Sequence, residues 1–360
     1  MRTEGAAQGI MNSVPLRTKL TAATVLLVFM LMAVCNALVT QKSLVKLTNT
    51  EIANTHPVYL LPSGYAFSIW GIIYLLQGLF CVVQCLPFSW GGLTDPAFAK
   101  IRPIVLLLFA SNATWLFLFG YEAYWLSVVI ILVYDACLFA VLLSLDVDML
   151  STQPRVIVKF AAAAFSANAS WVTVASCLGI QVALLEEGWP PSPGFAVGLL
   201  GIAVLVACTS IIRWSDPVYA AVAAWALGGI INNQGPDSEW GCNTQICPAC
   251  ISGGGELSIC ERINTVSSLH GWADASNGYA ALECNRYNES VARVCIVDKS
   301  KLVSGWALAG IVIVAVTLVV SLSRGCARRV IAARTEHLDG RDVEGDAKKL
   351  TCGSEKENEL

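Results

Sequence analysis

Residues 103–145 decide the fold class of this chain. They read PIVLLLFASNATWLFLFGYEAYWLSVVIILVYDACLFAVLLSL. Only residues 120–123, Gly-Tyr-Glu-Ala, separate two long apolar runs, which indicates a tight helical hairpin. Each run approaches the roughly 20 apolar residues that a helix needs to cross about 30 Å of hydrocarbon. The stretch therefore predicts two adjacent transmembrane helices.

Similar apolar runs recur along most of the 360 residues. The chain is 56% hydrophobic and 14% charged, with a mean hydropathy of +0.62. Soluble domains are about 45–50% apolar and about 25% charged, so the lipid bilayer must be the solvent for much of this chain. The predicted fold class is an all-α integral membrane protein, with helices near residues 20–40, 65–86, 103–120, 124–145, 157–182, 195–213, 217–232 and 302–323.

The distribution of Lys and Arg predicts the orientation of these helices, because cytoplasmic loops of membrane proteins carry an excess of both. If the N-terminus is inside, Lys42 and Lys46 are the only Lys or Arg residues in the short outside loops. Arg17 and Lys19 before the first run also leave open that this helix is a cleaved signal peptide. The predicted parts are a cytoplasmic N-terminus (1–19), a bundle of about seven helices (20–232), an extracytoplasmic Cys-rich loop (233–301), a last helix (302–323) and a disordered cytoplasmic tail (324–360).

The loop 233–301 is polar, rich in glycine and contains six cysteines. Disulfides persist on the extracytoplasmic side, and an even number of Cys fits three bridges in a connectivity that the sequence leaves open. The alternative is zinc, since Cys247 and Cys250 have the spacing of metal ligands, but no second such pair follows. Asn288 begins an N-glycosylation triplet on the same side. The predicted disulfide-forming residues are Cys242, Cys247, Cys250, Cys260, Cys284 and Cys295.

Aromatic and polar residues inside the predicted helices are candidates for a binding site. Phe67, Trp70 and Tyr74 recur at i, i+3 and i+7, which places three rings on one helix face. Asn112 and Trp115 share a face for the same reason, and Asn112 is expected to point into the bundle and find a partner there. Such residues suit either tight helix packing or a ligand cavity.

Three more interior residues complete the candidate binding set: Asp135, Trp171 and Trp225. Asp135 is the one acid deep in a predicted span. Intramembrane acids are often functional, and a neutral Asp hydrogen-bonded to a neighbouring helix is the equally favoured structural alternative. The remaining Trp at span ends form the expected aromatic belt: Trp90, Trp125, Trp189, Trp214 and Trp306.

Four segments of the chain carry a resemblance to a known family. They are PSGYAFSIWGIIYLL (62–76), NATWLF (112–117), ASWVTVA (169–175) and YAAVAAWALGGI (219–230). In this order they resemble helices of the tryptophan-rich sensory proteins, relatives of the translocator protein (peripheral benzodiazepine receptor) family. Phe67, Trp70 and Tyr74 match the family's spacing, while Pro62 lies one position off. The resemblance covers roughly residues 20–232.

The resemblance implies a translocator-protein-like five-helix bundle, here with about three further helices, and an aromatic pocket for tetrapyrroles, sterols or drug-like aromatic compounds. The expected function is to bind, sense or transport such a small hydrophobic ligand. No cofactor beyond a porphyrin- or haem-type ligand, no metal and no catalytic residue is expected, because no GxSxG, P-loop or HExxH motif is present.

A rival function is a membrane-anchored interaction protein that presents the disulfide-stapled loop to an extracytoplasmic protein partner. A homodimer is compatible with either function, and the small net charge of −3 gives no indication of a nucleic-acid partner. The expected location is the plasma membrane or a membrane of the secretory route, with an organelle membrane left open.

Overall fold

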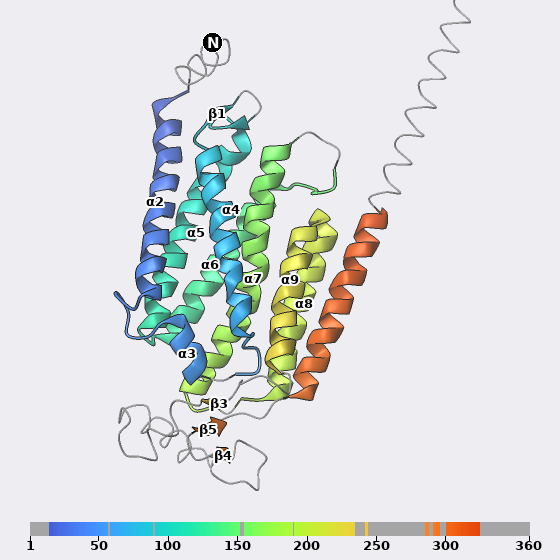
Figure 1. Ribbon diagram of the computed structural model, residues 1–360. Helices are drawn as coiled ribbons and strands as arrows, with labels where there is room; N and C mark the ends of the chain where they lie inside the picture. Colours follow the sequence, from blue (N-terminus) through green and yellow to red (C-terminus); the bar gives the residue numbers. More distant parts are fainter. Residues whose placement is uncertain are drawn as a thin grey trace, which may run out of the picture.

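The computed structural model describes residues 14–56, 58–88, 91–151, 155–189, 191–234, 242–243, 285–287, 291–295 and 300–324. Nearly all of this part is helical (Figure 1). Two short helices, α3 (Asn49–Thr55) and the 3-10 helix η1 (Gly64–Ser68), lie between the first two long ones. The long helices are α2 (Leu16–Thr40), α4 (Ile69–Val83), α5 (Pro96–Gly120), α6 (Tyr124–Leu145), α7 (Val156–Glu186), α8 (Pro193–Trp214), α9 (Pro217–Asn233) and the last helix, Lys301–Arg324.

All of the helices expected from the sequence are therefore present. Seven stretches of the described chain, with η1 and α4 taken as one, are long and apolar enough to cross a membrane. α9 has 17 residues, which at 1.5 Å per residue extend over about 25 Å, at the lower limit for a crossing. The chain is a helical integral membrane protein, as the composition predicts.

Five of these helices, α2, α4, α5, α6 and α7, form a closed ring. The neighbouring pairs are α2–α5, α5–α6, α6–α7, α7–α4 and α4–α2. Aromatic side chains fill its interior, and the Phe80 ring of α4 meets the Phe165 ring of α7 edge-on at 4.9 Å between centroids. The ring corresponds to the five-helix bundle that the family resemblance implies.

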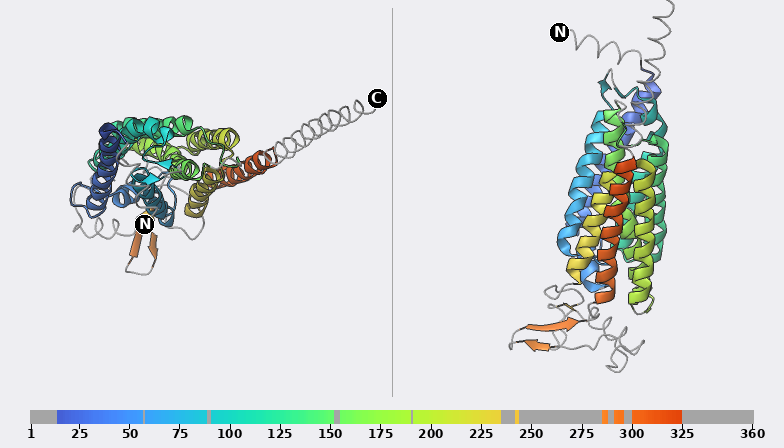
Figure 2. Two further views of the ribbon diagram at one scale, coloured as in Figure 1. Left: turned by 90° about the horizontal axis from the view of Figure 1, so that it is seen from above. Right: turned by 90° about the vertical axis from the view of Figure 1, so that its right-hand side faces the viewer.

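The other three long helices stand beside this ring, on its α7 side (Figure 2). α8 and α9 both pack on α7 and on each other. A Cβ atom on Gly310 of the last helix would lie 2.9 Å from the Val204 side chain of α8, so the two helices approach closely there. The Ser321 hydroxyl donates to the Ile211 carbonyl at 3.2 Å and ties the far end of the last helix to α8.

Three of the helices begin with the same local chemistry, an Asp or Ser at the N-cap followed by Pro. The side chains of Asp95, Ser192 and Asp216 accept hydrogen bonds from backbone N–H groups of α5, α8 and α9. An N-cap acceptor satisfies a backbone donor that has no partner within the helix, and Pro suits the next position because it has no N–H to satisfy. These pairs fix where α5, α8 and α9 start.

The two ends of the bundle differ. α3 and the C-terminal end of α7 lie at one end, here called the outer end, together with the strands β3 (Cys242–Asn243), β4 (Asn285–Tyr287) and β5 (Val291–Cys295) (Figure 1). The opposite, inner end holds β1 (Pro87–Phe88) paired with β2 (Gly91–Gly92). The helix directions also gather there the basic residues that the sequence assigns to the cytoplasm: Arg17, Lys19, Lys100, Arg102, Arg155, Lys159, Arg213 and Arg324.

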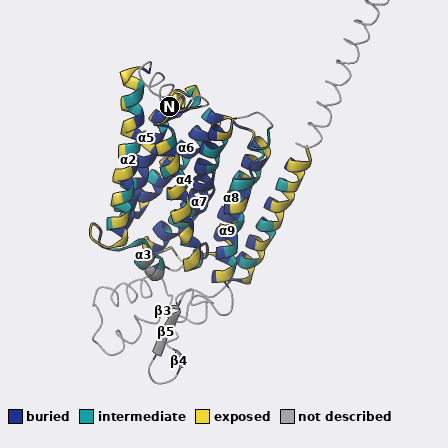
Figure 3. Cartoon of the chain, turned by 45° about the horizontal axis from the view of Figure 1, so that its top comes forward, coloured by how far each residue is buried: buried dark blue, intermediate teal, exposed yellow. Residues whose placement is uncertain are grey.

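Large apolar side chains are exposed on the outward faces of the helices (Figure 3). Leu31 of α2 and Val319 of the last helix are examples, and lipid is the solvent that such faces require. Of the Trp residues expected in the aromatic belt, Trp125, Trp189 and Trp306 are exposed, whereas Trp214 is buried. Trp214 ends α8 and packs into the main core cluster, which explains why it faces inward.

Candidate functional site

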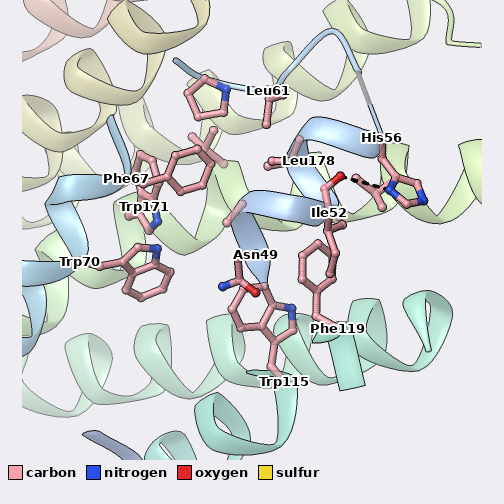
Figure 4. Close-up of a pocket in the computed structure, with 16 residues that line it drawn as sticks. Asn49, Ile52, His56, Leu61, Phe67, Trp70, Trp115, Phe119, Trp171 and Leu178 are labelled. Atoms are coloured by element: carbon pink, nitrogen blue, oxygen red, sulfur yellow. Dashed lines mark hydrogen bonds between the residues drawn. The ribbon is translucent and has the colours of Figure 1, made fainter. Parts of the chain in front are cut away.

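A cleft lies at the outer end of the ring, between α3, α4, α5 and α7 (Figure 4). It holds about 640 Å³ of space, including its opening to the surroundings. Ligand pockets typically have a mainly apolar lining with a few polar groups. The cleft fits this description, since five of its lining residues are Phe or Trp: Phe67, Trp70, Trp115, Phe119 and Trp171.

The aromatic side chains of the cleft come from η1 and three long helices and contact one another. The Trp171 ring of α7 meets Phe67 and Trp70 edge-on, at 5.8 Å and 6.3 Å between centroids. Trp115 stacks on Phe119 of the same helix at 5.3 Å. Edge-on and offset-stacked pairs are the favoured geometries of aromatic rings, so these walls hold a defined shape.

The short helix α3 forms the outer wall of the cleft. A capping box starts it: the Thr48 hydroxyl accepts from the Glu51 N–H at 3.2 Å, and the Glu51 carboxylate accepts from the Thr48 N–H at 2.7 Å. Lys42 binds the same carboxylate at 2.7 Å. The Lys42 hydrogen bond, with the Thr48 N–H, lowers the pKa of Glu51 from its ordinary value. α3 directs Asn49, Ile52 and Ala53, followed by His56, toward the cleft.

A polar layer lies about one helical turn below the aromatic side chains, nearer the bundle centre. Tyr74 follows Trp70 by four residues on α4 and stacks on it at 5.4 Å. Asn112 and Asn168 precede Trp115 and Trp171 by three residues, and α5 and α7 run opposite to α4, so all three residues lie on the inner side of their Trp (Figure 1). The layer, here called the floor, therefore lies on the inner side of the cleft lining, although Tyr74, Asn112 and Asn168 do not themselves line the cleft.

Tyr134 of α6 joins the helices of this floor. Its hydroxyl accepts from the Nδ2 atoms of Asn112, at 3.2 Å, and Asn168, at 2.5 Å. All three side chains are fully buried. Asn36 of α2 donates to the Tyr74 hydroxyl at 2.5 Å. Buried polar groups in lipid are costly unless paired, so these bonds hold the helices in one register.

Several polar atoms at the cleft have no hydrogen-bond partner among the described residues. Two belong to the lining, the Trp171 indole Nε1 and the Asn49 Oδ1. Two belong to the floor, the Oδ1 atoms of Asn112 and Asn168. Trp171 is only 3% exposed. The lining thus includes a buried donor and a buried acceptor without a partner among the described residues, within mainly apolar walls.

The structure brings together four of the eight candidate residues from the sequence, Phe67, Trp70, Trp115 and Trp171, as lining of the cleft. Tyr74 and Asn112 lie in the floor, and Asn112 has the hydrogen-bond partner that was expected. Asp135 and Trp225 lie elsewhere. The Trp225 ring is 40% exposed and its Nε1 donates to the Ala66 carbonyl at 3.0 Å.

Asp135 belongs to a second polar cluster, between α6, α7 and α9. Both of its carboxylate oxygens lie near the Thr173 hydroxyl, at 3.3 Å and 3.4 Å. The same hydroxyl donates to the Ala169 carbonyl at 2.9 Å and lies 3.1 Å from the Tyr219 hydroxyl. Asp135 thus faces a neighbouring helix, as expected of an acid in a membrane span, but it does not line the cleft.

Neither α3 nor Asn168 was among the site elements predicted from the sequence. Thr48-x-x-Glu51 is the pattern of a capping box and could have indicated a helix start at this position. Asn168-Ala-Ser-Trp171 repeats the spacing of Asn112-Ala-Thr-Trp115. Both four-residue segments place Asn about one helical turn from Trp. Their similarity could have indicated that Asn112 and Asn168 lie in the same polar layer.

The predicted modification sites lie mostly outside the described residues. Cys247, Cys250, Cys260, Cys284 and Asn288 are among those not described. Cys242 of β3 and Cys295 of β5 are opposite each other in the antiparallel register of these strands. Within the described ranges, no three His, Cys, Asp or Glu side chains are close enough to hold a metal ion.

Comparison with known proteins agrees with the five-helix ring. No curated protein and no solved structure gives a significant match. The model of one family, described as TSPO-like protein, matches residues 22–255. Since this match covers well over half of the chain and includes every residue of the ring that lines the cleft, the chain belongs to the TSPO-like protein family.

Proposed function

We propose that this membrane protein binds a small, flat, hydrophobic ligand in the cleft between α3, α4, α5 and α7. The observation that carries the proposal is the buried Trp171 indole, whose N–H has no partner among the described residues while its ring forms a wall of the cleft. An unpaired buried donor costs about 1–3 kcal/mol. A ligand with an acceptor at this position would recover that cost.

The aromatic walls favour a tetrapyrrole over a sterol. Phe67, Trp70 and Trp171 present ring faces and edges from η1, α4 and α7. A conjugated macrocycle pairs with such rings for roughly 0.5–1.5 kcal/mol per pair beyond the burial of apolar area. A saturated sterol gains the burial alone. The family membership makes both classes reasonable, and the ring geometry favours the conjugated one.

The polar atoms of the lining indicate which functional groups the ligand should carry. The Trp171 N–H can donate to a carbonyl, a carboxylate or a ring nitrogen of the ligand. The Asn49 Oδ1 can accept a hydrogen bond from an N–H or O–H group. Porphyrins carry both kinds of group. A ligand that satisfied both atoms would lie across the cleft from α7 to α3.

Fluorescence titration of the purified protein in nanodiscs with protoporphyrin tests this proposal. Binding should be saturable and should quench Trp fluorescence. Trp70→Leu and Trp115→Leu should weaken binding roughly two- to tenfold each, from the loss of ring pairing. Trp171→Phe keeps a ring and removes the N–H, and should weaken binding by a similar factor.

Trp189→Leu is the matched control, because Trp189 is 67% exposed and lies outside the cleft. It should leave the affinity unchanged. Absence of saturable binding to a porphyrin and to a radiolabelled sterol would overturn the proposal, as would equal effects of Trp70→Leu and Trp189→Leu. A variant in which a short Gly-Ser linker replaces residues 244–284 should still bind; loss of binding there would favour the rival function, in which the loop recognises a protein partner.

A further inference from the structure

His56 occupies a position from which it touches both the cleft and the end of α7. It is 4% exposed and lies directly after α3. Its Nδ1 atom is 3.1 Å from the Ile52 carbonyl oxygen, the contact drawn as a dashed line in Figure 4. Its Nε2 atom is 3.0 Å from the Glu186 carboxylate in the last turn of α7.

These two contacts determine the charge of the imidazole that the arrangement requires. A carbonyl and a carboxylate only accept hydrogen bonds, so each ring nitrogen must donate. A neutral imidazole carries one N–H and leaves the lone pair of its other nitrogen facing an oxygen. The imidazolium has two N–H groups and satisfies both contacts. The arrangement around His56 is therefore complete only in the protonated state.

Other titratable groups lie on the elements around His56. Tyr124 of α6 meets the imidazole edge-on, at 5.1 Å between centroids. α5, which also packs on α3, presents the uncharged Trp115 and Phe119 to the cleft. On α3 itself, Glu51 is paired with Lys42. The remaining acids on adjoining elements are Glu187, beside Glu186, and Glu122, in the turn between α5 and α6.

We propose that His56 and Glu186 form a proton-dependent latch that holds α3 against α7 and so controls exchange of ligand through the outer end of the cleft. The latch rests on the proposed function, because it regulates that same site. Asn49, Ile52 and Ala53 line the cleft from α3, so movement of α3 away from α7 widens its opening. Imidazole changes charge between about pH 5 and 8. Protonation gives both ring nitrogens an N–H and adds an ion pair to the Glu186 contact, so acidification on the outer side tightens the latch and raising the pH weakens it.

Amide hydrogen exchange of α3 tests the latch without any ligand. Exchange of residues 49–55 is compared between wild type and Glu186→Gln at the same pH, because the ratio cancels the intrinsic pH dependence of exchange. Glu186 is 35% exposed, so this substitution is compatible with folding. Wild type should be protected roughly three- to tenfold more than the variant at pH 5.5 and by a smaller factor at pH 8, where the ion pair is lost.

Glu187→Gln is the matched control and should behave as wild type at both pH values. His56→Gln keeps an N–H donor toward Glu186 but cannot change charge, so its protection relative to Glu186→Gln should not depend on pH. A wild-type ratio that is the same at pH 5.5 and pH 8 would overturn the latch, as would a Glu187→Gln variant that resembles Glu186→Gln.

The release rate of protoporphyrin tests whether the latch controls ligand exchange. It should rise about three- to tenfold in wild type between pH 5.5 and 8, and should be fast and independent of pH in Glu186→Gln. The two measurements separate the two proposals. If porphyrin does not bind, the exchange ratio still tests the latch. If porphyrin binds while its release from wild type and Glu186→Gln is the same at each pH, the latch is wrong and the binding function stands.

Discussion

Replacing Gly229 by Ala should destabilise the protein, whereas the same change at the adjacent Gly228 should not. Gly229 faces η1 from α9: a Cβ atom there would lie 2.8 Å from the Ala66 Cβ and 3.0 Å from the Pro62 Cβ. Its carbonyl also accepts a hydrogen bond from the Ser63 N–H at 3.0 Å. A Cβ atom on Gly228 would have no neighbour within 4 Å.

The size of the destabilisation depends on whether the atoms near Gly229 can move apart. Both atoms near Gly229 are fixed to the backbone, so α9 and residues 62–66 must separate by at least about 0.6 Å to reach the 3.4 Å of ordinary contact. Overpacking of this kind costs about 1–3 kcal/mol. Ala gains up to about 1 kcal/mol over Gly in a helix, and this gain is common to both variants. The difference between them is therefore the steric cost alone, about 1–3 kcal/mol.

Unfolding by denaturant in mixed micelles measures this difference, with far-UV circular dichroism as the signal. Gly228→Ala should equal or exceed wild type in stability, and Gly229→Ala should fall below it. Pro62 lines the cleft and directly precedes the N-cap of η1, so displacing it through Gly229→Ala should also weaken porphyrin binding. Equal stability of the two variants, or a less stable Gly228→Ala, would refute the close packing of α9 on η1.

Three further predictions concern the loop, the second polar cluster and α3. Mass spectrometry without reduction should find three disulfides among the six loop cysteines, accessible only from outside; several free thiols or bound zinc would contradict this. Asp135→Asn should preserve folding and leave porphyrin affinity unchanged, since Asn can still bond Thr173 and position 135 is not in the lining; altered affinity would give the acid a functional role. Because Lys42 and then the Thr48 N–H lower the pKa of Glu51, its contribution to α3 is present above its ordinary value of 4.5 and is lost as pH falls through the lower folded-state value. Exchange of residues 49–55 should therefore show this acid transition in wild type, and Glu51→Gln should remove it.

The helices could be predicted from the sequence because lipid leaves few alternatives to an apolar run of this length. Residues 103–145 lie in α5 and α6 with the expected turn between them, although α5 begins earlier, at Pro96. α7 extends from Val156 to Glu186, beyond the expected 157–182. Its additional outer turn carries Glu186, which contacts His56, so hydropathy alone could not indicate that polar end.

The cleft was only partly predictable, since which face of a helix points inward depends on its neighbours. Phe67 and Trp70 were placed on one face by their spacing, and the structure directs both toward Trp171. Trp225 sits well inside its helix, yet α9 turns that face toward Tyr65, 5.3 Å away between ring centroids, and toward the surface. Position along a span gives depth in the membrane, whereas direction around the helix is set by packing.

The meaning of the two Asn-Ala-Ser/Thr-Trp segments becomes clear from the directions of the helices that carry them. Alone, residues 112–115 and 168–171 are two short similar strings. Because α5 and α7 run in the same direction, both place Trp toward the outer end and Asn about one turn deeper. α4 runs oppositely and reverses the order, with Trp70 before Tyr74. The same two layers, aromatic above and hydrogen-bonding below, therefore recur on three helices, and Tyr134 joins the lower one. If the proposed ligand stacks on the Trp rings, this floor should limit its depth, and a group that donates to the Asn112 or Asn168 Oδ1 should be stabilised there.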